Sequence, residues 1–385
     1  MIVAPDTSAF VQDPDAVEIY TTGGNRTTLT SADGFTYPAP TSPKSSVTNV
    51  FNGSRTITSS FFGLHVANAS TGVPRDIDYA WVRCHDTYGG TRWHTINPSN
   101  GTFVYTNPDA FIDAFAAAGK EIVFLLGFTP DWASASTPNT GKYDNGTTAR
   151  ATNQPPSNTA FWDAFCSAMA TRYANRGVKY WEIWNEVNYT SYWSGTAAQL
   201  ATLVRRASQV IKGIDATAKI LAPTIQEPET GGSGIAYLNS WMAASDGAAG
   251  TGKDWMDFCS IHMYPPKYNF SVHAQQYDNT RAALDAAGKT STAIWNTETG
   301  VLQGDGIQPA VKAKWLKRSL ALAAAKGVQR FAWYAYDNDT MSMTTEEKDA
   351  WNAVRTVLLS GAITNCAILP DERVCITVNG RNYTY

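Results

Sequence analysis

The chain has 385 residues, enough for one large domain with attachments or for two domains. Its 30 Lys and Arg nearly balance 33 Asp and Glu, which excludes binding driven by a basic surface, such as binding to nucleic acid or an anionic membrane. No apolar run is long enough to cross a bilayer, and five cysteines without a CxxC pair argue against a zinc site or a disulfide scaffold.

The N-terminal segment, residues 1–58, is predicted to be an extended or β-rich attachment. It is rich in Thr, Ser, Gly, Asn and Pro, and it contains a short alternating stretch at 17–20. Its first ten residues, MIVAPDTSAF, lack both the basic and the apolar part of a signal peptide, so we do not expect one there.

From residue 59 to 360, apolar runs of strand length alternate with helical patterns. The strand-like runs lie at 61–66, 79–85, 121–128, 179–186, 219–224, 257–264, 292–298 and 330–337. Helices are expected at 107–119, at 157–177 with Ser157 as its cap, and at 196–214, 235–244, 273–287, 308–326 and 345–359. The gap at 67–78 is too short for a full helix.

Eight buried strands alternating with helices predict an α/β fold, a closed (β/α)8 TIM barrel. A doubly wound open sheet is the competing architecture. The absence of a Gly-rich phosphate turn after the first strand disfavours that alternative.

Residues 361–385 return to strand-like alternation. They are predicted to form a short C-terminal β-hairpin packed on the barrel, or the start of a truncated β-domain. Cys366 and Cys375 flank the turn-like segment AILPDERV and are either bridged across the hairpin or free thiols. Cys84, Cys166 and Cys259 lie inside apolar runs and are expected to be core residues.

Two glutamates stand out because each ends a strongly apolar run: Glu186 after YWEIWN and Glu298 after AIWNT. In a parallel barrel the catalytic groups lie at the carboxyl ends of the strands. Cleavage of a glycosidic bond needs one carboxylic acid and one carboxylate. A lone Glu at such a position is more often a structural carboxylate, but the pair at the ends of the fourth and seventh strands favours catalysis.

The chain is rich in aromatic residues, with 13 Trp, 18 Tyr and 15 Phe. Aromatic rings pack well against the apolar face of a sugar, and Trp93, Trp132 and Trp193 follow strand ends, so they are candidate sugar platforms. Core packing is the alternative for each of them. His65 ends the first strand and is either a substrate contact or a core histidine.

Three further acidic residues have weaker assignments. Glu182 has the same alternation parity as Glu186, and we expect it to pair with Arg83 inside the barrel rather than to catalyse. Asp86 and Asp337 also follow strands and are candidate acceptors for substrate hydroxyls.

Five strand-end signatures occur in order along the chain: RCHDTYGGTRWHTI, GFTPDWAS, YWEIWNEVN, IHMYP and IWNTETG. In these signatures, over about residues 60–360, the chain resembles the clan A retaining (β/α)8 glycoside hydrolases. Within the clan it is most similar to glycoside hydrolase family 39 and related bacterial exopolysaccharide endo-hydrolases. The resemblance implies that Glu186 is the general acid/base and Glu298 the nucleophile.

The resemblance also implies roles for the residues around this pair. Donors beside Glu298 would keep it ionised, whereas apolar neighbours such as Trp184 and Trp193 would favour the protonated form of Glu186. The implied substrate-binding residues are Asn185 on the sugar 2-hydroxyl, Arg83 and Tyr264 on Glu298, His262 near Glu186 or orienting the cluster, and Trp333 as the floor of the cleavage subsite.

We therefore predict a retaining glycoside hydrolase that acts by double displacement on a poly- or oligosaccharide. It is expected to be endo-acting on a microbial exopolysaccharide or a cell-wall glycan. The alternatives are an exo-acting β-xylosidase-like glycosidase and a non-catalytic carbohydrate-binding barrel. No metal or cofactor is expected, because no HxH or HExxH motif is present. The resemblance implies an extracellular or periplasmic location, and a monomer is expected.

Overall fold

The computed structural model describes residues 29–30, 36–37, 47–67, 72–85, 87, 90–136, 151–227, 233–265, 269–301, 307–338 and 341–385. Most of the attachment predicted for residues 1–58, and Asp86, lie outside the described residues. Within that attachment, β1 (Leu29–Thr30) pairs antiparallel with β2 (Thr36–Tyr37). No described helix is both long and apolar enough to cross a bilayer.

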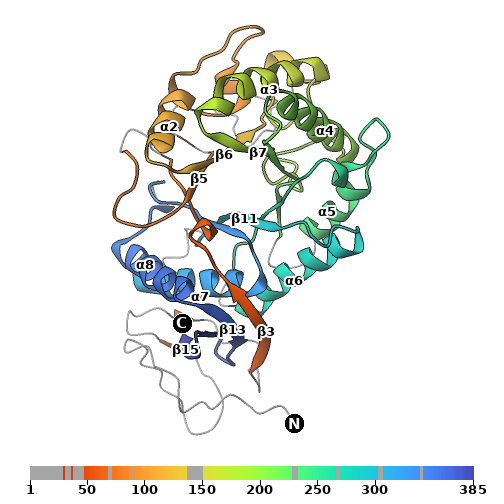
Figure 1. The fold of residues 1–385 in the computed structure, drawn as a ribbon. Helices are drawn as coiled ribbons and strands as arrows, with labels where there is room; N and C mark the ends of the chain where they lie inside the picture. The colour runs from red at the N-terminus through yellow and green to blue at the C-terminus, as the bar shows by residue number, and fades with distance from the viewer. Residues whose placement is uncertain are drawn as a thin grey trace.

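A closed ring of parallel strands forms the centre of the molecule (Figure 1). β12 pairs with β4, which closes the sheet between its last and first strands. The ring contains β4 (Phe62–His65), β5 (Trp81–Cys84), β6 (Glu121–Leu126), β7 (Val178–Ile183), β8 (Lys219–Leu221), β9 (Ile225–Gln226), β10 (Cys259–His262), β11 (Ile294–Thr299) and β12 (Arg330–Trp333).

β8 and β9 are two parts of one barrel strand. β8 pairs with β7, β9 pairs with β10, and the chain between them passes through the Ala222–Pro223 peptide bond. Proline has no N–H to donate to a ladder, so an interruption at this position is expected. Counted in this way the barrel has eight strands, and the predicted (β/α)8 architecture is confirmed.

Helices surround the ring, as Figure 1 shows. They are α1 (Trp93–Ile96), α2 (Thr106–Ala117), α3 (Thr159–Tyr173), α4 (Ala197–Ile214), α5 (Ser233–Ala243), α6 (Phe270–Ala286), α7 (Pro309–Lys326) and α8 (Thr345–Leu359). α3 is capped by Asn158, whose side chain accepts from the Ala160 N–H, and not by Ser157 as predicted. Among the described residues between β4 and β5 there is no helix, as expected.

Aromatic side chains fill the amino-terminal end of the barrel. Trp81 and Trp295 lie inside it with ring centroids 5.8 Å apart, and Arg330 lies 4.4 Å above the Trp295 ring. Gly63 makes room for Trp81, because a Cβ at residue 63 would lie 2.1 Å from the indole. This end is therefore closed by packing, and polar chemistry is left to the carboxyl ends of the strands.

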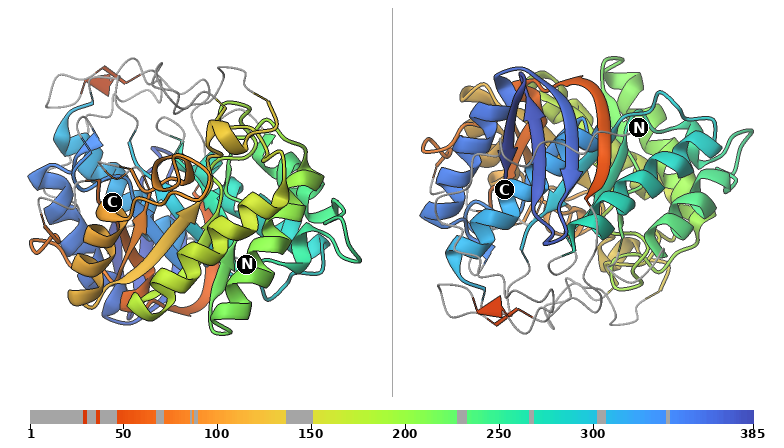
Figure 2. Two further views of the ribbon diagram at one scale, coloured as in Figure 1. Left: turned by 90° about the horizontal axis from the view of Figure 1, so that it is seen from above. Right: turned by 90° about the horizontal axis from the view of Figure 1, so that it is seen from below.

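A small antiparallel sheet lies beside α7 and α8 (Figure 2). Its strands are β13 (Ala362–Ile368), β14 (Val374–Val378) and β15 (Arg381–Thr384), with β3 (Thr48–Thr56) from the N-terminal segment paired to β13. The C-terminal segment thus forms one strand more than the expected hairpin. β3 gives β13 a second neighbour and covers what would otherwise be an open edge.

The two C-terminal cysteines are free thiols. Cys366 lies opposite Ile376, and Cys375 lies opposite Ala367. Because successive side chains of a strand leave opposite faces, this register directs the two thiols to different faces of the sheet. A disulfide would need both thiols on one face. Cys84, Cys166 and Cys259 are also free and buried, as expected of core residues.

Candidate active site

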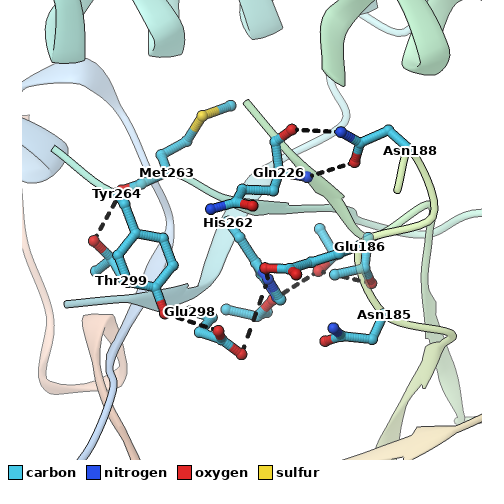
Figure 3. Close-up of polar contacts among 12 residues, drawn as sticks. Asn185, Glu186, Asn188, Gln226, His262, Met263, Tyr264, Glu298 and Thr299 are labelled. Atoms are coloured by element: carbon cyan, nitrogen blue, oxygen red, sulfur yellow. Dashed lines mark hydrogen bonds and ion pairs between the residues drawn. The ribbon is translucent and has the colours of Figure 1, made fainter. Parts of the chain in front are cut away.

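The barrel brings Glu186 and Glu298 together at the carboxyl ends of its strands, beyond β7 and within β11 (Figure 3). One carboxylate oxygen of each residue and one ring nitrogen of His262 all lie within 4.8 Å of one another. Glu186 is 6% exposed and Glu298 8% exposed, so both carboxyls are largely enclosed but can be reached by solvent.

Two donors hold the Glu298 carboxylate. Arg83 donates from Nη1 to Oε2 over 2.7 Å, and the Tyr264 hydroxyl donates to Oε1 over 2.8 Å. Burial, followed by the nearby charges of Glu298 and Glu186, raises the pKa of Tyr264 well above its ordinary value of 10, so the hydroxyl keeps its proton. A carboxylate that accepts from two such donors is favoured in its charged form, as a nucleophile requires.

Glu186 is held by His262 instead. His262 Nδ1 lies 2.9 Å from Glu186 Oε1 and 3.9 Å from Glu298 Oε2, and the imidazole is fully buried between the two carboxyls. Figure 3 shows this order, with Glu298 and Tyr264 on one side of His262 and Glu186 on the other. The histidine therefore orients Glu186 and lies between its carboxyl and that of Glu298.

The end of β7 turns two consecutive side chains toward the site. Trp184 and Glu186 have φ values of 67° and 42°, in the left-handed region that side-chain-bearing residues rarely adopt. A regular strand would direct Asn185 and Glu186 to opposite faces. The left-handed turn allows Asn185 to reach Arg83, while Glu186 reaches His262.

Arg83 connects Glu298 to the barrel interior. Its guanidinium donates to Glu298, to Asn185 Oδ1 over 2.8 Å and to Glu182. The predicted pairing of Glu182 with Arg83 is therefore present. Burial alone would raise the pKa of Glu182, but the charge of Arg83, then His262 and the hydroxyls of Ser260 and Thr297, outweigh it and lower that pKa.

Several predicted substrate-binding residues lie elsewhere. Trp93 is fully buried, stacked on Phe165 at 5.1 Å, and Trp193 is buried against Trp184 with ring centroids 4.7 Å apart. Neither is a sugar platform, because no ring face is left for a ligand. Core residues also follow strand ends, so this position alone does not identify a sugar platform.

Trp333 does not form the floor of the site. It is 1% exposed, lies in the core between barrel and helices with Phe331, and hydrogen-bonds Glu347 of α8. Alternation along β12 places Ala332 inside the barrel, so the next residue of that parity, Tyr334, faces the site. Its ring packs on His65 at 4.8 Å and it is half-buried. Counting parity from Arg330 could have identified Tyr334.

The remaining candidate residues, Trp132, His65 and Asp337, differ in their burial and in their hydrogen-bond partners. Trp132 is half-buried, with its indole N–H donating to the Asn97 carbonyl over 2.8 Å, so part of its ring is accessible. His65 is 1% exposed, and its Nε2 lies 2.8 Å from the carbonyl of Thr297, the residue directly before Glu298. Asp337 accepts from the Ala67 N–H over 2.6 Å and so ties the ends of β4 and β12 together.

The carboxylates and His262 are also the kind of cluster that can hold a metal ion. Both oxygens of Glu298, however, already accept from Arg83 and Tyr264. A cation on Glu298 would have to lie close to the Arg83 guanidinium, whose positive charge opposes it. The donor set therefore fits an ionised carboxylate better than a metal ligand.

Buried histidines of the strand ends and of α6 make the stability of the protein depend on pH. Burial first, with the charge of Arg83 second, lowers the pKa of His65 and His85 well below 6.5, and burial lowers that of His273 to about 4. These groups are neutral when folded but take up protons when unfolded, so the stability they contribute is complete above pH 6.5 and is lost as pH falls.

We therefore expect the free energy of unfolding to decrease between pH 6.5 and about 4, with each of these histidines contributing up to about 1.4 kcal/mol per pH unit. Urea unfolding at several pH values measures this. Substitution of His273, which is remote from the carboxylates, by Gln should reduce the slope. An unchanged slope in that variant would contradict the assignment.

Comparison with known proteins agrees with the geometry. The profile of the family described as cellulase, glycosyl hydrolase family 5, matches residues 91–339. Family 5 is itself a member of clan A, so the clan identified from the sequence is confirmed. No curated protein sequence matches the chain.

Solved structures share the fold at low identity. A monomeric β-xylosidase from Caulobacter crescentus has a TM-score of 0.59 at 17% identity, with 85% of this chain and 75% of that one covered. A family 39 enzyme from Xanthomonas axonopodis pv. citri has a TM-score of 0.57 at 16% identity, with 88% of this chain and 75% of that one covered. A bifunctional glucanase-xylanase from a metagenome library has a TM-score of 0.58 at 15% identity, with 86% of this chain and 85% of that one covered.

Proposed function

The chain belongs to the cellulase family, glycosyl hydrolase family 5, and we propose that this glycoside hydrolase cleaves its substrate with retention, by double displacement. The observation that carries the proposal is the separation of the two carboxyls, with an oxygen of each within 4.8 Å. Retaining enzymes hold their carboxyl groups about 5–5.5 Å apart, whereas inverting enzymes leave a wider gap of roughly 6.5–9.5 Å for a water molecule.

Each carboxyl has the surroundings that its step needs. Glu298, held by Arg83 and Tyr264, attacks the anomeric carbon and forms a glycosyl ester, while Glu186 gives its proton to the departing oxygen. Glu186, now ionised beside His262, then takes a proton from the water that hydrolyses the ester. Asn185 has its carbonyl oxygen on Arg83, which leaves its amide N–H groups for the sugar 2-hydroxyl.

For the substrate we propose the backbone of a cell-wall glycan, cut at internal linkages. The family is named for cellulase action, and one structural neighbour is described as a glucanase-xylanase, which supports a backbone of glucose or xylose. A microbial exopolysaccharide is the second polysaccharide class to test. Exo-action on short xylosides is the alternative, and the β-xylosidase among the neighbours favours it.

The experiment is a panel of cellulose, mixed-linkage glucan, xylan, xyloglucan and bacterial exopolysaccharides, with reducing ends and viscosity followed together. Endo-action lowers viscosity early, exo-action releases monosaccharide with little change in viscosity, and NMR of the first product reports its anomer. A product of inverted configuration would reject double displacement. Binding without cleavage of any glycan would favour a non-catalytic barrel.

Replacing the acid should have an effect that depends on the leaving group. In Glu186→Gln we expect cleavage of natural glycans to fall by about 10³-fold, while the first step on aryl glycosides with acidic phenols falls much less, because those phenols leave without a proton. Steady-state and burst kinetics on both substrate classes measure this. Equal losses on both would remove Glu186 as the acid.

We further propose that the enzyme works as a monomer outside the cytoplasm, where large polysaccharides are encountered. The neighbour described as monomeric supports the first part. Light scattering of the purified protein and fractionation of the native source test the two statements separately.

A further inference from the structure

One side chain at the mouth of the barrel has no assigned task. Gln226 ends β9, and in the parallel ladder it lies beside His262. Side chains at paired positions of neighbouring strands leave the same face, so Gln226 points into the mouth as His262 does. Figure 3 shows its amide extending from β9 toward the carboxylates.

The backbone of Gln226 is fixed, whereas its side chain is unused. The Asn188 amide donates to the Gln226 carbonyl and accepts from the Gln226 N–H, each over 2.9 Å. Gln226 is half-buried, and among the described residues its side-chain amide has no hydrogen-bond partner. An amide with two donors and an acceptor, held in place but unpaired at a reaction centre, suits a ligand hydroxyl.

The position of Gln226 in the ring of strands indicates which sugar unit of the substrate it would contact. Arg83 and Asn185 lie on the β5 side of Glu186, whereas Gln226 lies on the opposite side, since β8 and β9 follow β7 in the ring. In the proposed function the glycone is held between Glu298 and Asn185, and the departing sugar leaves from Glu186. The side of Glu186 away from Asn185 is therefore the side of the departing sugar.

From these observations, and resting on the proposed function, we propose that Gln226 binds a hydroxyl of the leaving-group sugar and that Asn188 positions it. Gln226 then stabilises only the first step, in which that sugar departs. It also favours the reverse type of reaction, in which a sugar hydroxyl attacks the glycosyl ester of Glu298 and gives its proton to Glu186. Water, which makes no such contact, gains nothing from it.

The test compares two substrates with the same glycone. In Gln226→Ala we expect kcat/KM to fall about tenfold or more on cellotriose or xylotriose, the size of one good hydrogen bond, and by less than about threefold on the matching para-nitrophenyl disaccharide. The share of glycosyl-enzyme transferred to added cellobiose or xylobiose should fall similarly. Asn188→Ala should show a smaller loss with the same selectivity.

Gln275→Ala, an exposed glutamine of α6, is the matched control and should change neither substrate. Retained aryl glycoside activity shows that Gln226→Ala is folded. Equal losses on both substrates, or no loss on either, would overturn the assignment to the leaving-group sugar. A wild type inactive on all of these substrates would instead reject the proposed glucose or xylose backbone, and with it the assignment of Gln226 to a sugar of that backbone.

Discussion

Glu298→Ala should lose activity by at least about 10³-fold on every substrate, because in the proposed double displacement the variant has no group to form the covalent intermediate. The loss should not depend on the leaving group, which distinguishes it from Glu186→Gln. Initial rates on an aryl glycoside and on the matching oligosaccharide measure it. Glu346→Ala, which removes an exposed carboxylate of α8, is the control and should keep full activity.

Azide added to the Glu298→Ala variant allows the stereochemistry of the reaction to be measured as well. The side chain removed from residue 298 leaves space beside Arg83 and Tyr264, where a small anion can bind and attack the anomeric carbon directly. We expect azide to restore cleavage of an activated aryl glycoside and to give a glycosyl azide of inverted configuration. In Glu186→Ala the intermediate on Glu298 still forms, so azide should give the retained configuration. Activity of Glu298→Ala within tenfold of wild type would remove it as nucleophile.

Arg83→Met should reduce both stability and activity. The substitution leaves Glu182 fully buried without its cation, and breaking a buried ion pair from one side costs about 3–5 kcal/mol. It also removes one donor from Glu298, for which we expect a loss of about 10²–10³-fold in kcat. Urea unfolding and kinetics on the same preparation measure the two effects.

The dependence of this loss on pH identifies its cause. In the wild type the pKa of Glu182 is lowered, so its contribution to stability is complete above the ordinary value of 4.5 and is lost as pH falls through the folded value. Without Arg83, burial raises the pKa of Glu182, and the residue is protonated more readily. The difference in the free energy of unfolding between variant and wild type should therefore shrink toward pH 4.5. A difference that is constant with pH would show that Glu182 is not responsible.

A double variant separates structure from chemistry. Arg83→Met combined with Glu182→Gln removes the unpaired buried charge, so it should recover much of the lost stability. It leaves Glu298 without its guanidinium donor, so activity should remain low. Recovery of activity along with stability would mean that Arg83 acts only by supporting the fold.

The sequence by itself determined the barrel and the pair of carboxyls. Both follow from local patterns: apolar runs of strand length bury both faces of a parallel sheet, and a charged residue at the end of such a run can lie only at the mouth. Glu186 and Glu298 could therefore be identified before any contact between their strands was known. The same reasoning predicted the pairing of Glu182 with Arg83, because parity along a strand is a property of the chain.

Only the tertiary structure decided what surrounds that pair. Whether a Trp after a strand binds sugar or fills the core depends on which remote side chains pack against it, as Phe165 does against Trp93. Trp333 was misassigned in place of Tyr334, and the left-handed turn at Trp184 and Glu186 broke the alternation used to place side chains. Likewise β3 paired with β13 across most of the chain, and Gln226 came to lie beside His262 through the pairing of β9 with β10. Such contacts join residues far apart in sequence, and no local pattern encodes them.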